Sequence, residues 1–333
     1  MSAERIAVIG DGGWGTALAL SLESAGHSVT VWGPFPDYAR EVGTKHENRL
    51  YLPGISLPRE IRWTANPDEA VADAAVVVLA IPTQYFRATL KRFTGLIPAC
   101  AQIVSVAKGL DSETLDRMSR VAETELQRES VAALSGPSLA DEVARGIPTA
   151  VVIASRDAAQ ARALQSVFGT PRLRVYTSDD VVGVELGGAL KNVIAVAVGT
   201  SDGLGFGGNT RAAIITRGLA EITRLGVALG AHPITFSGLS GLGDLIVTCT
   251  SQLSRNHSVG EKLGRGEKLA DILGGMKQVA EGVPNSRTAL KLAQSVKVDT
   301  PIIQAIYSVL YENLNPRQAV TDLMGREARP ERD

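Results

Sequence analysis

The sequence predicts an α/β protein, in which an N-terminal doubly wound parallel sheet, residues 1–180, is followed by an all-helical domain, residues 181–333. Short runs of Val, Ile and Ala alternate with longer amphipathic segments in the first half of the chain, as in repeated strand–helix units. A glycine-rich turn follows the first of these runs directly. Beyond Ser178 the strand pattern ends, and long helical segments separated by Gly-rich turns follow.

Six short apolar segments are expected to form the strands: residues 5–9, 28–32, 75–80, 102–106, 131–135 and 149–154. Residues 14–24, 113–128 and 158–168 have helical character and lie between them. In such a sheet, ligands bind to loops at the carboxyl ends of the strands. In the second half, residues 181–198 are apolar nearly all round, as in a buried helix, and residues 211–229 are amphipathic.

Composition excludes several classes of protein. Apolar residues make up 44% of the chain and charged residues 21%, which is typical of a globular protein rather than a disordered or fibrous one. With 34 basic and 35 acidic residues the net charge is -1, so no overall field gathers nucleic acid, and an anionic ligand needs local cations. Cys100 and Cys249 are far apart in sequence, which argues against a zinc site or a disulfide framework.

The sequence also predicts a cytoplasmic protein. Its N-terminus, MSAERIAVIG, lacks the basic, apolar and cleavage regions of a secretory signal. The apolar stretch at 181–200 is interrupted by Glu185 and Lys191, and charges at mid-bilayer are costly, so no transmembrane segment is expected. The few cysteines fit a reducing compartment.

The turn GDGGWG has Gly10, Gly12 and Gly15 at the GxGxxG spacing of dinucleotide-binding sites. Gly10 permits the tight turn, Gly12 lets the backbone approach the pyrophosphate, and Gly15 lets helix and strand pack closely. The helix that follows also presents free N–H groups to an anion. The motif alone occurs in plain turns, but its place between a strand and a helix favours a bound dinucleotide.

Whether the cofactor is NAD or NADP stays open. The second strand ends in Trp32, Gly33 and Pro34, where an acid would accept a bond from the ribose 2′-hydroxyl or an Arg would pair with a 2′-phosphate. Neither residue type stands there, and Asp37 and Arg40 lie further on.

Lys108 follows the strand expected at 102–106, at the sheet edge where ligands bind. Most lysines serve only solubility, but one placed between an apolar strand and a glycine favours a ligand. At residues 135–146, SGPSLADEVARG, another strand gives way to a helix. There Gly136 and Ser138 are placed to donate to an anion, although Ser138 as a simple helix cap is an equal reading.

Lys191 lies in VELGGALKNVIAVAVG, where residues three and four positions away are Leu, Gly, Ile and Ala. Burial disfavours the charged ammonium and lowers a lysine's pKa, which suits a group that gives and takes protons near neutral pH. The alternative is that the amine extends to the surface. The adjacent Asn192 supplies a further hydrogen-bonding group, and the pair favours a functional role.

A second polar group lies in GLGDLIVTCTSQLSRNHS, residues 241–258. This segment holds Asp244, Thr248, Ser254, Arg255 and Asn256 in otherwise apolar surroundings. Arg suits a phosphate because its planar guanidinium donates two parallel bonds, and Asp244 can orient a catalytic lysine. Each residue singly is more often a cap or a surface group, but their density favours a site. His257 is interpreted as incidental.

These motifs together resemble those of the bacterial NAD(P)-dependent glycerol-3-phosphate dehydrogenases over nearly the full chain. The matching segments are GDGGWGTALA, NRLYLPGISLP, VAKGL, SGPSLADEVARGIPTA, GVELGGALKNVIAVAVG, DGLGFGGNTRAAIITRGLAE, GLGDLIVTCTSQLSRN and QVAEGV. The resemblance implies a Rossmann domain, a helical domain, a homodimer, catalysis between the two domains and a role in phospholipid synthesis. It makes Lys191 the general acid/base.

The resemblance also assigns binding residues. Its substrate-binding positions are Lys108, Gly136, Ser138, Asp244, Ser254, Arg255 and Asn256, and its cofactor-binding positions are Gly13, Trp14, Lys108, Ala140, Arg255, Val279 and Glu281. In one departure, Pro34 stands where the family often carries Arg or His.

Our hypothesis is that hydride passes from the nicotinamide to C2 of dihydroxyacetone phosphate while Lys191 protonates the oxygen. Lys108 and Asp244 would support that centre, and Arg255 with Asn256 would bind the phosphate. Two alternatives are a related 2-hydroxy acid dehydrogenase, which predicts activity without a substrate phosphate, and a non-catalytic dinucleotide sensor, which has no need of a buried Lys191.

Overall fold

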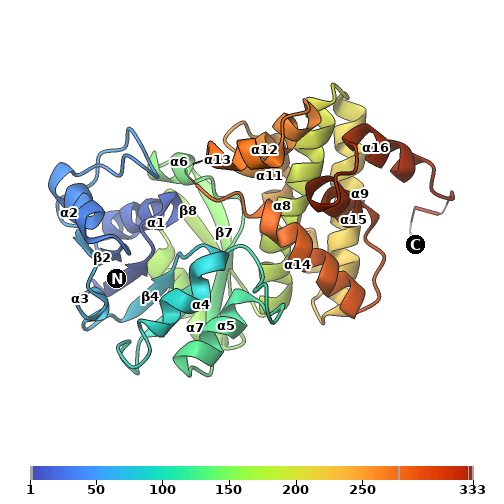
Figure 1. The fold of residues 1–333 in the computed structure, drawn as a ribbon. Coiled ribbons are helices and arrows are strands. Elements are labelled where there is room, and N and C mark those ends of the chain that lie inside the picture. The colour runs from blue at the N-terminus through green and yellow to red at the C-terminus, as the bar shows by residue number, and fades with distance from the viewer. Residues whose placement is uncertain (1–2, 277, 329, 332–333) are drawn as a thin grey trace.

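The computed structural model describes residues 3–276, 278–328 and 330–331. Figure 1 shows two parts side by side, a helix-covered sheet formed by the first half of the chain and a group of packed helices formed by the second. The predicted fold class, an α/β sheet followed by helices, is confirmed.

The sheet has eight strands, which are β1 (Arg5–Ile9), β2 (Ser28–Trp32), β3 (Arg62–Thr64), β4 (Val76–Leu79), β5 (Gln102–Ser105), β6 (Ala132–Ser135), β7 (Thr149–Ala154) and β8 (Leu173–Ser178). Their order is β3-β2-β1-β4-β5-β6-β7-β8. Neighbouring strands are parallel except β6 and β7, where Leu134 lies opposite Ile153 in an antiparallel pair. The sequence predicted a parallel sheet, which is observed at every other pair of neighbouring strands but not at this one. The connection between these two strands contains α6 (Ala140–Ala144), which packs on α1 (Gly13–Ser24). After α6 the chain reverses direction and enters β7.

All six predicted strands are present, with ends that differ by one residue at most. The sequence pattern missed β3, which is very short, and β8, which alternates buried and exposed residues as an edge strand does. The helix expected at 113–128 is shorter and forms α5 (Met118–Leu126). Asp111 accepts backbone N–H bonds from Glu113 and Thr114 at 3.0 and 2.9 Å, which holds the preceding segment in a turn instead.

Helices cover both faces of the sheet. Besides α1, α5 and α6 they are α2 (Pro36–Lys45), α3 (Pro67–Val71), α4 (Thr83–Lys91) and α7 (Ala158–Phe168). Alternate residues of β1 point to opposite faces, so Ile6 packs in a cluster with α1 and α7, whereas Ala7 packs in a cluster with α3, α4 and α5. Both faces being covered, the carboxyl ends of the strands remain for ligands.

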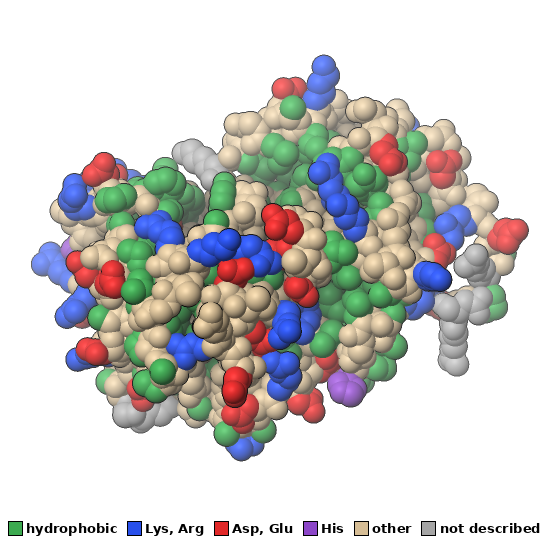
Figure 2. Space-filling view, turned by 60° about the horizontal axis from the view of Figure 1, so that its bottom comes forward, with side chains coloured by type: hydrophobic (Ala, Val, Ile, Leu, Met, Phe, Trp, Pro, Cys, Tyr) green, Lys and Arg blue, Asp and Glu red, His purple; other side chains and the backbone are tan. Residues whose placement is uncertain are grey.

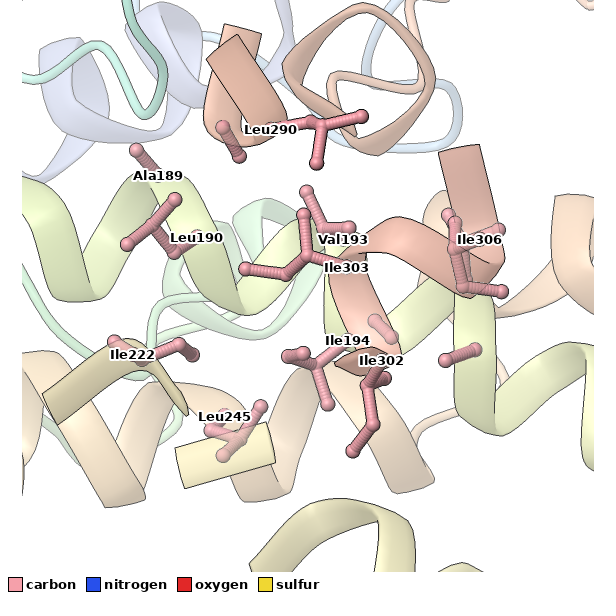
Figure 3. Packing of buried hydrophobic residues seen from close by; sticks show 14 of the residues in the cluster. Ala189, Leu190, Val193, Ile194, Ile222, Leu245, Leu290, Ile302, Ile303 and Ile306 are labelled. Carbon is pink, nitrogen blue, oxygen red and sulfur yellow. The ribbon is translucent and has the colours of Figure 1, made fainter. Parts of the chain in front are cut away.

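The second part is helical, as predicted. It comprises α8 (Val181–Gly203), α9 (Gly208–Ala228), α10 (Pro233–Phe236), a π-helical turn (Leu239–Gly243), α11 (Asp244–Thr250), α12 (Arg255–Gly264), α13 (Leu269–Gly274), α14 (Gly282–Ser295), α15 (Pro301–Tyr311) and α16 (Pro316–Met324). Figure 3 shows Leu190, Val193 and Ile194 of α8 among side chains such as Leu290 and Ile303. Among the described helices, α8 alone is long and apolar enough to cross a membrane, but 94% of its apolar window is buried inside the protein. It is therefore the core helix of this part.

Helix α12 lies close against α8 because glycines face each other at the contact. A Cβ on Gly199 would lie 2.0 Å from the carbonyl oxygen of His257, and a Cβ on Gly260 would lie 2.1 Å from that of Val196. Larger residues at either position would push the two helices apart. The close approach brings the start of α12 next to the middle of α8, where the candidate site is built.

Figure 2 shows one face of the molecule, on which basic and acidic side chains are interspersed rather than gathered by sign. This agrees with the net charge of -1. An anionic ligand must therefore be held by individual cations placed at its site.

Candidate active site

The glycine turn after β1 has the shape that the motif predicts. Gly10 has a φ of +121°, and a Cβ there would lie 2.3 Å from the carbonyl oxygen of Ala80. A Cβ on Gly15 would lie 2.1 Å from the carbonyl oxygen of Gly10, so the start of α1 packs directly on the turn. Beside Gly12, by contrast, no described atom comes within 4 Å of a Cβ. This open space next to free N–H groups fits the pyrophosphate of a dinucleotide.

Other residues that the resemblance assigns to the cofactor lie around this turn. A Cβ on Gly13 would lie 3.7 Å from the Cβ of Ala140, at the start of α6. The indole N–H of Trp14 is buried without a hydrogen-bond partner among the residues that the structure describes. Ala140 therefore lies beside the turn, next to Gly13.

Val279 and Glu281 belong to a segment of the helical part that reaches back to the sheet. Glu281 accepts hydrogen bonds from the backbone N–H of Thr83 at 3.2 Å and from its hydroxyl at 2.6 Å. Thr83 begins α4, which follows the carboxyl end of β4. Burial raises the pKa of Glu281 and the Thr83 bonds oppose that rise. The carbonyl oxygen of Val279 accepts a bond from Arg255 at 2.7 Å.

Asp244, the first residue of α11, joins two lysines from different parts of the molecule. One carboxylate oxygen accepts a hydrogen bond from Nζ of Lys191 in α8. The other accepts from Nζ of Lys108, in the loop after β5, at 2.8 Å. The Asp244 side chain is only 1% exposed, so both ion pairs are shielded from water. The sequence predicted all three residues as site residues, and the fold brings them together.

Lys191 is the more deeply buried of the two lysines. Its residue exposure is 5%, and Nζ also donates to the hydroxyl of Thr248 at 2.7 Å. That hydroxyl in turn donates to the carbonyl oxygen of Asp244 at 2.6 Å. Burial lowers the pKa of Lys191 to about 8; the negative charge of Asp244 opposes the shift and the positive charge of Lys108 adds to it. A lysine near neutrality can both give and take a proton.

The Nζ atom of Lys108 donates three hydrogen bonds. Besides Asp244, Nζ donates to the carbonyl oxygen of Gly136 at 2.9 Å and to the hydroxyl of Ser138 at 3.1 Å. The Ser138 hydroxyl donates to the same Gly136 carbonyl at 2.8 Å, so the reading of Ser138 as a helix cap is wrong. Lys108 is 16% exposed in its side chain, which makes it the more open of the two lysines.

A chain of amides connects α8, α12 and α14. Asn256 donates to the side-chain oxygen of Asn192 at 2.9 Å and accepts from the backbone N–H of Gly282 at the same distance. Asn192 donates to the carbonyl oxygen of Lys108 at 3.2 Å. These bonds tie the loop after β5 to three helices of the second part, which holds Lys108 in position.

Two of the expected site residues lie apart from the lysines. Ser254 accepts a hydrogen bond from the backbone N–H of His257 at 3.2 Å and so caps α12. Arg255 is exposed, and its guanidinium donates a hydrogen bond to the carbonyl oxygen of Val279. Its guanidinium therefore lies beside the segment that connects the helical part to the start of α4.

The structure adds residues that the sequence pattern did not single out. Asn285 of α14 also donates to the carbonyl oxygen of Lys108, at 3.2 Å. Thr83 could have been found from the sequence, because it lies shortly after a buried strand, β4, and ligands bind at the carboxyl ends of such strands. His257, interpreted as incidental, has its ring nitrogen Nε2 at 2.7 Å from Asp202. No acid occurs at residues 32–34, but the fold brings the carboxylate of Asp11 next to Gly33.

Comparisons with known proteins show the family to which the chain belongs. Residues 5–161 match the family model of the NAD-dependent glycerol-3-phosphate dehydrogenase N-terminus, and residues 180–321 match that of its C-terminus. A glycerol-3-phosphate dehydrogenase (NAD(P)+) of Citrifermentans bemidjiense is 50% identical over 332 residues, 99% of each chain. That of Listeria monocytogenes is 46% identical, over all of this chain and 99% of its own. The crystal structure of the enzyme from Coxiella burnetii has a TM-score of 0.94 at 38% identity and covers 97% of this chain and 99% of its own.

Proposed function

The chain belongs to the family of NAD-dependent glycerol-3-phosphate dehydrogenases, and from that membership we propose that it interconverts dihydroxyacetone phosphate and sn-glycerol 3-phosphate with NAD(P)H. The observation that carries the proposal is the buried group of Lys191, Asp244 and Lys108 at the carboxyl edge of the sheet. A cofactor sensor needs no such group, and a substrate without phosphate needs no cation such as Arg255 to bind it.

The cofactor fits the turn at residues 10–15, and Gly13, Trp14, Ala140, Arg255, Val279 and Glu281 surround its path. When bound, NAD(P)H supplies the hydride that forms the new C–H bond at C2 of the substrate. Glu281 and Thr83 fix the returning segment against α4, so that Val279 and Arg255 line the same space.

In the proposed reduction, the ammonium of Lys191 donates its proton to the C2 oxygen as the carbonyl becomes an alcohol. The amine that remains is stable because burial already favours the neutral form. In the reverse oxidation the neutral amine takes the hydroxyl proton. Asp244 and Thr248 hold Nζ in one position, which saves the ordering cost at the moment of transfer.

Lys108 supplies a second positive charge to the developing oxygen anion. Its three bonds to Gly136, Ser138 and Asp244 fix its position before the substrate arrives. Arg255 is proposed to bind the phosphate of the substrate with Asn256, whose amide bonds to Asn192 and Gly282 hold it beside Arg255.

Further properties are proposed together with this activity. Residues 1–180 form the dinucleotide-binding domain and residues 181–333 the helical, catalytic and dimerisation domain; β8 ending at Ser178 and α8 starting at Val181 support that division. We also propose that the enzyme is a cytoplasmic homodimer, which the family resemblance supports, and that its product supplies phospholipid synthesis. Sedimentation of the purified chain tests the dimer.

The activity itself is tested by following nicotinamide absorbance with dihydroxyacetone phosphate, using NADH and NADPH in parallel. Consumption of reduced cofactor that depends on the phosphorylated substrate supports the proposal. Oxidation that proceeds equally well with dihydroxyacetone, which lacks the phosphate, would contradict it.

A further inference from the structure

Asp11 stands inside the glycine turn, and its carboxylate is buried with one oxygen unpaired. The residue is 6% exposed, and Oδ2 has no hydrogen-bond partner among the residues that the structure describes. Burial raises its pKa to about 6, and a hydrogen bond from its own backbone N–H opposes that rise. A buried carboxylate with an unsatisfied oxygen destabilises the fold, so its presence in a ligand-binding turn indicates that a ligand completes it.

The carboxylate lies at the end of β2. A Cβ added at Gly33 would be 2.3 Å from Oδ2 and 2.7 Å from Cγ of Asp11. Asp11 therefore fills the space that a side chain at position 33 would take. This position directly follows β2, where dinucleotide-binding folds carry the acid that reads the adenosine ribose. Gly33 leaves room for an acid supplied by the turn instead of by the strand.

The backbone of Asp11, not its carboxylate, is what fixes the residue. Its carbonyl oxygen accepts hydrogen bonds from the side-chain amide of Asn48 at 2.7 Å and from the hydroxyl of Thr16 at 3.3 Å. Asn48 is itself held by the hydroxyl of Tyr38 at 2.7 Å. A neutral side chain at position 11 therefore leaves the turn intact, which makes the carboxylate testable by substitution.

No cation offsets this charge within the described residues. None of their ion pairs includes Asp11, and Pro34 brings no charge to the end of β2. Arg40 pairs with Asp37 at 3.2 Å on the surface, and Arg92 lies 4.8 Å from the ring centre of Trp32. The negative charge of Asp11 therefore stands alone where a 2′-phosphate would have to bind.

We propose, on the basis of the proposed function, that Asp11 binds the adenosine ribose and selects NAD over NADP in this enzyme. An ionised carboxylate accepts hydrogen bonds from the ribose hydroxyls of NAD, and these are stronger than neutral ones. The same carboxylate repels the 2′-phosphate of NADP, which also lacks the hydroxyl that would donate.

The test measures binding without turnover. Dissociation constants of NADH and NADPH are determined by energy transfer from protein tryptophan to the nicotinamide, without dihydroxyacetone phosphate. The proteins are the wild type, Asp11→Asn and the control Asp37→Asn, which removes the same charge from an acid whose side chain is 97% exposed nearby. Thermal denaturation of each variant shows that it is folded.

The wild type is expected to bind NADH at least about tenfold more tightly than NADPH, the size of one lost charge-assisted bond. In Asp11→Asn this preference should fall about tenfold, by weaker NADH and stronger NADPH binding, while Asp37→Asn keeps it. Equal binding of both cofactors by the wild type would overturn the inference, as would an equal change in both variants. Binding of neither cofactor would remove the proposed function, and the inference with it.

Discussion

Asp244 holds the buried amine of Lys191 with one carboxylate oxygen and leaves its second oxygen to a lysine of the other half of the molecule. The two lysines come from α8 and from the loop after β5, so their positions depend on the docking of the helical part onto the sheet.

Lys191→Ala should reduce turnover by about 100-fold or more, because it removes the proposed proton donor. The dissociation constant of NADH should stay nearly unchanged, since Lys191 belongs to α8 and not to the cofactor turn. Steady-state kinetics and cofactor fluorescence measure the two effects. The control Lys291→Ala removes an exposed lysine of α14 and should change neither. Normal turnover in Lys191→Ala would refute the proposed role.

The reduction should depend on pH through Lys191, whose pKa burial lowers to about 8. The reduction needs the protonated amine, so kcat/KM should be constant below about pH 8 and fall above it; the oxidation needs the neutral amine and should fall on the acid side. In Asp244→Asn the negative charge that raises this pKa is lost, so the falling limb of the reduction should move to lower pH. The test is the pH profile of kcat/KM for Asp244→Asn and for the exposed control Asp271→Asn. If the falling limb of the reduction stayed in place in both variants, the proposed titration of Lys191 would be contradicted.

Thr248→Val should lower kcat for the reduction by about tenfold, because a methyl group replaces the hydroxyl that accepts from Lys191. The two side chains have nearly the same shape, so packing around α11 is kept. Thr248→Ser retains the hydroxyl and should remain close to the wild type. If Thr248→Val and Thr248→Ser gave the same kcat, the hydroxyl would have no part in positioning the amine.

Substitutions at two glycines of the turn, Gly15 and Gly12, should affect protein stability and cofactor binding separately. Gly15→Ala places a Cβ 2.1 Å from the carbonyl oxygen of Gly10, which should lower the free energy of unfolding by about 1–3 kcal/mol. Gly12→Ala meets no described atom within 4 Å, so its stability should match the wild type while NADH binds more weakly. Denaturant unfolding and fluorescence titration measure both. Unimpaired NADH binding in Gly12→Ala would contradict the assigned path of the pyrophosphate.

Arg255→Ala should raise KM for dihydroxyacetone phosphate by about tenfold or more, because the guanidinium is the proposed partner of the phosphate. Since Arg255 also contacts Val279, the dissociation constant of NADH is measured in the same variant. Arg317→Ala, which removes an exposed Arg of α16, serves as the control. An unchanged dependence on substrate concentration would count against this role.

The sequence by itself determined the local features of this protein. Glycine spacing in residues 10–15, the apolar runs of the strands and the apolar surroundings of Lys191 each reflect a preference that acts over a few neighbouring residues. The same patterns, together with the family resemblance, identified Lys108, Asp244 and Thr248. They missed β8 because an edge strand is apolar on one side only.

The tertiary structure decided which of these residues meet. That Asp244 lies between two lysines, that Asn285 supports the loop of Lys108, and that β7 runs antiparallel to β6 all depend on packing between segments far apart in the chain. Asp11 gives the clearest case, because its neighbour Gly33 follows another strand, β2. No local pattern contains that contact, since the pairing of β1 with β2 creates it.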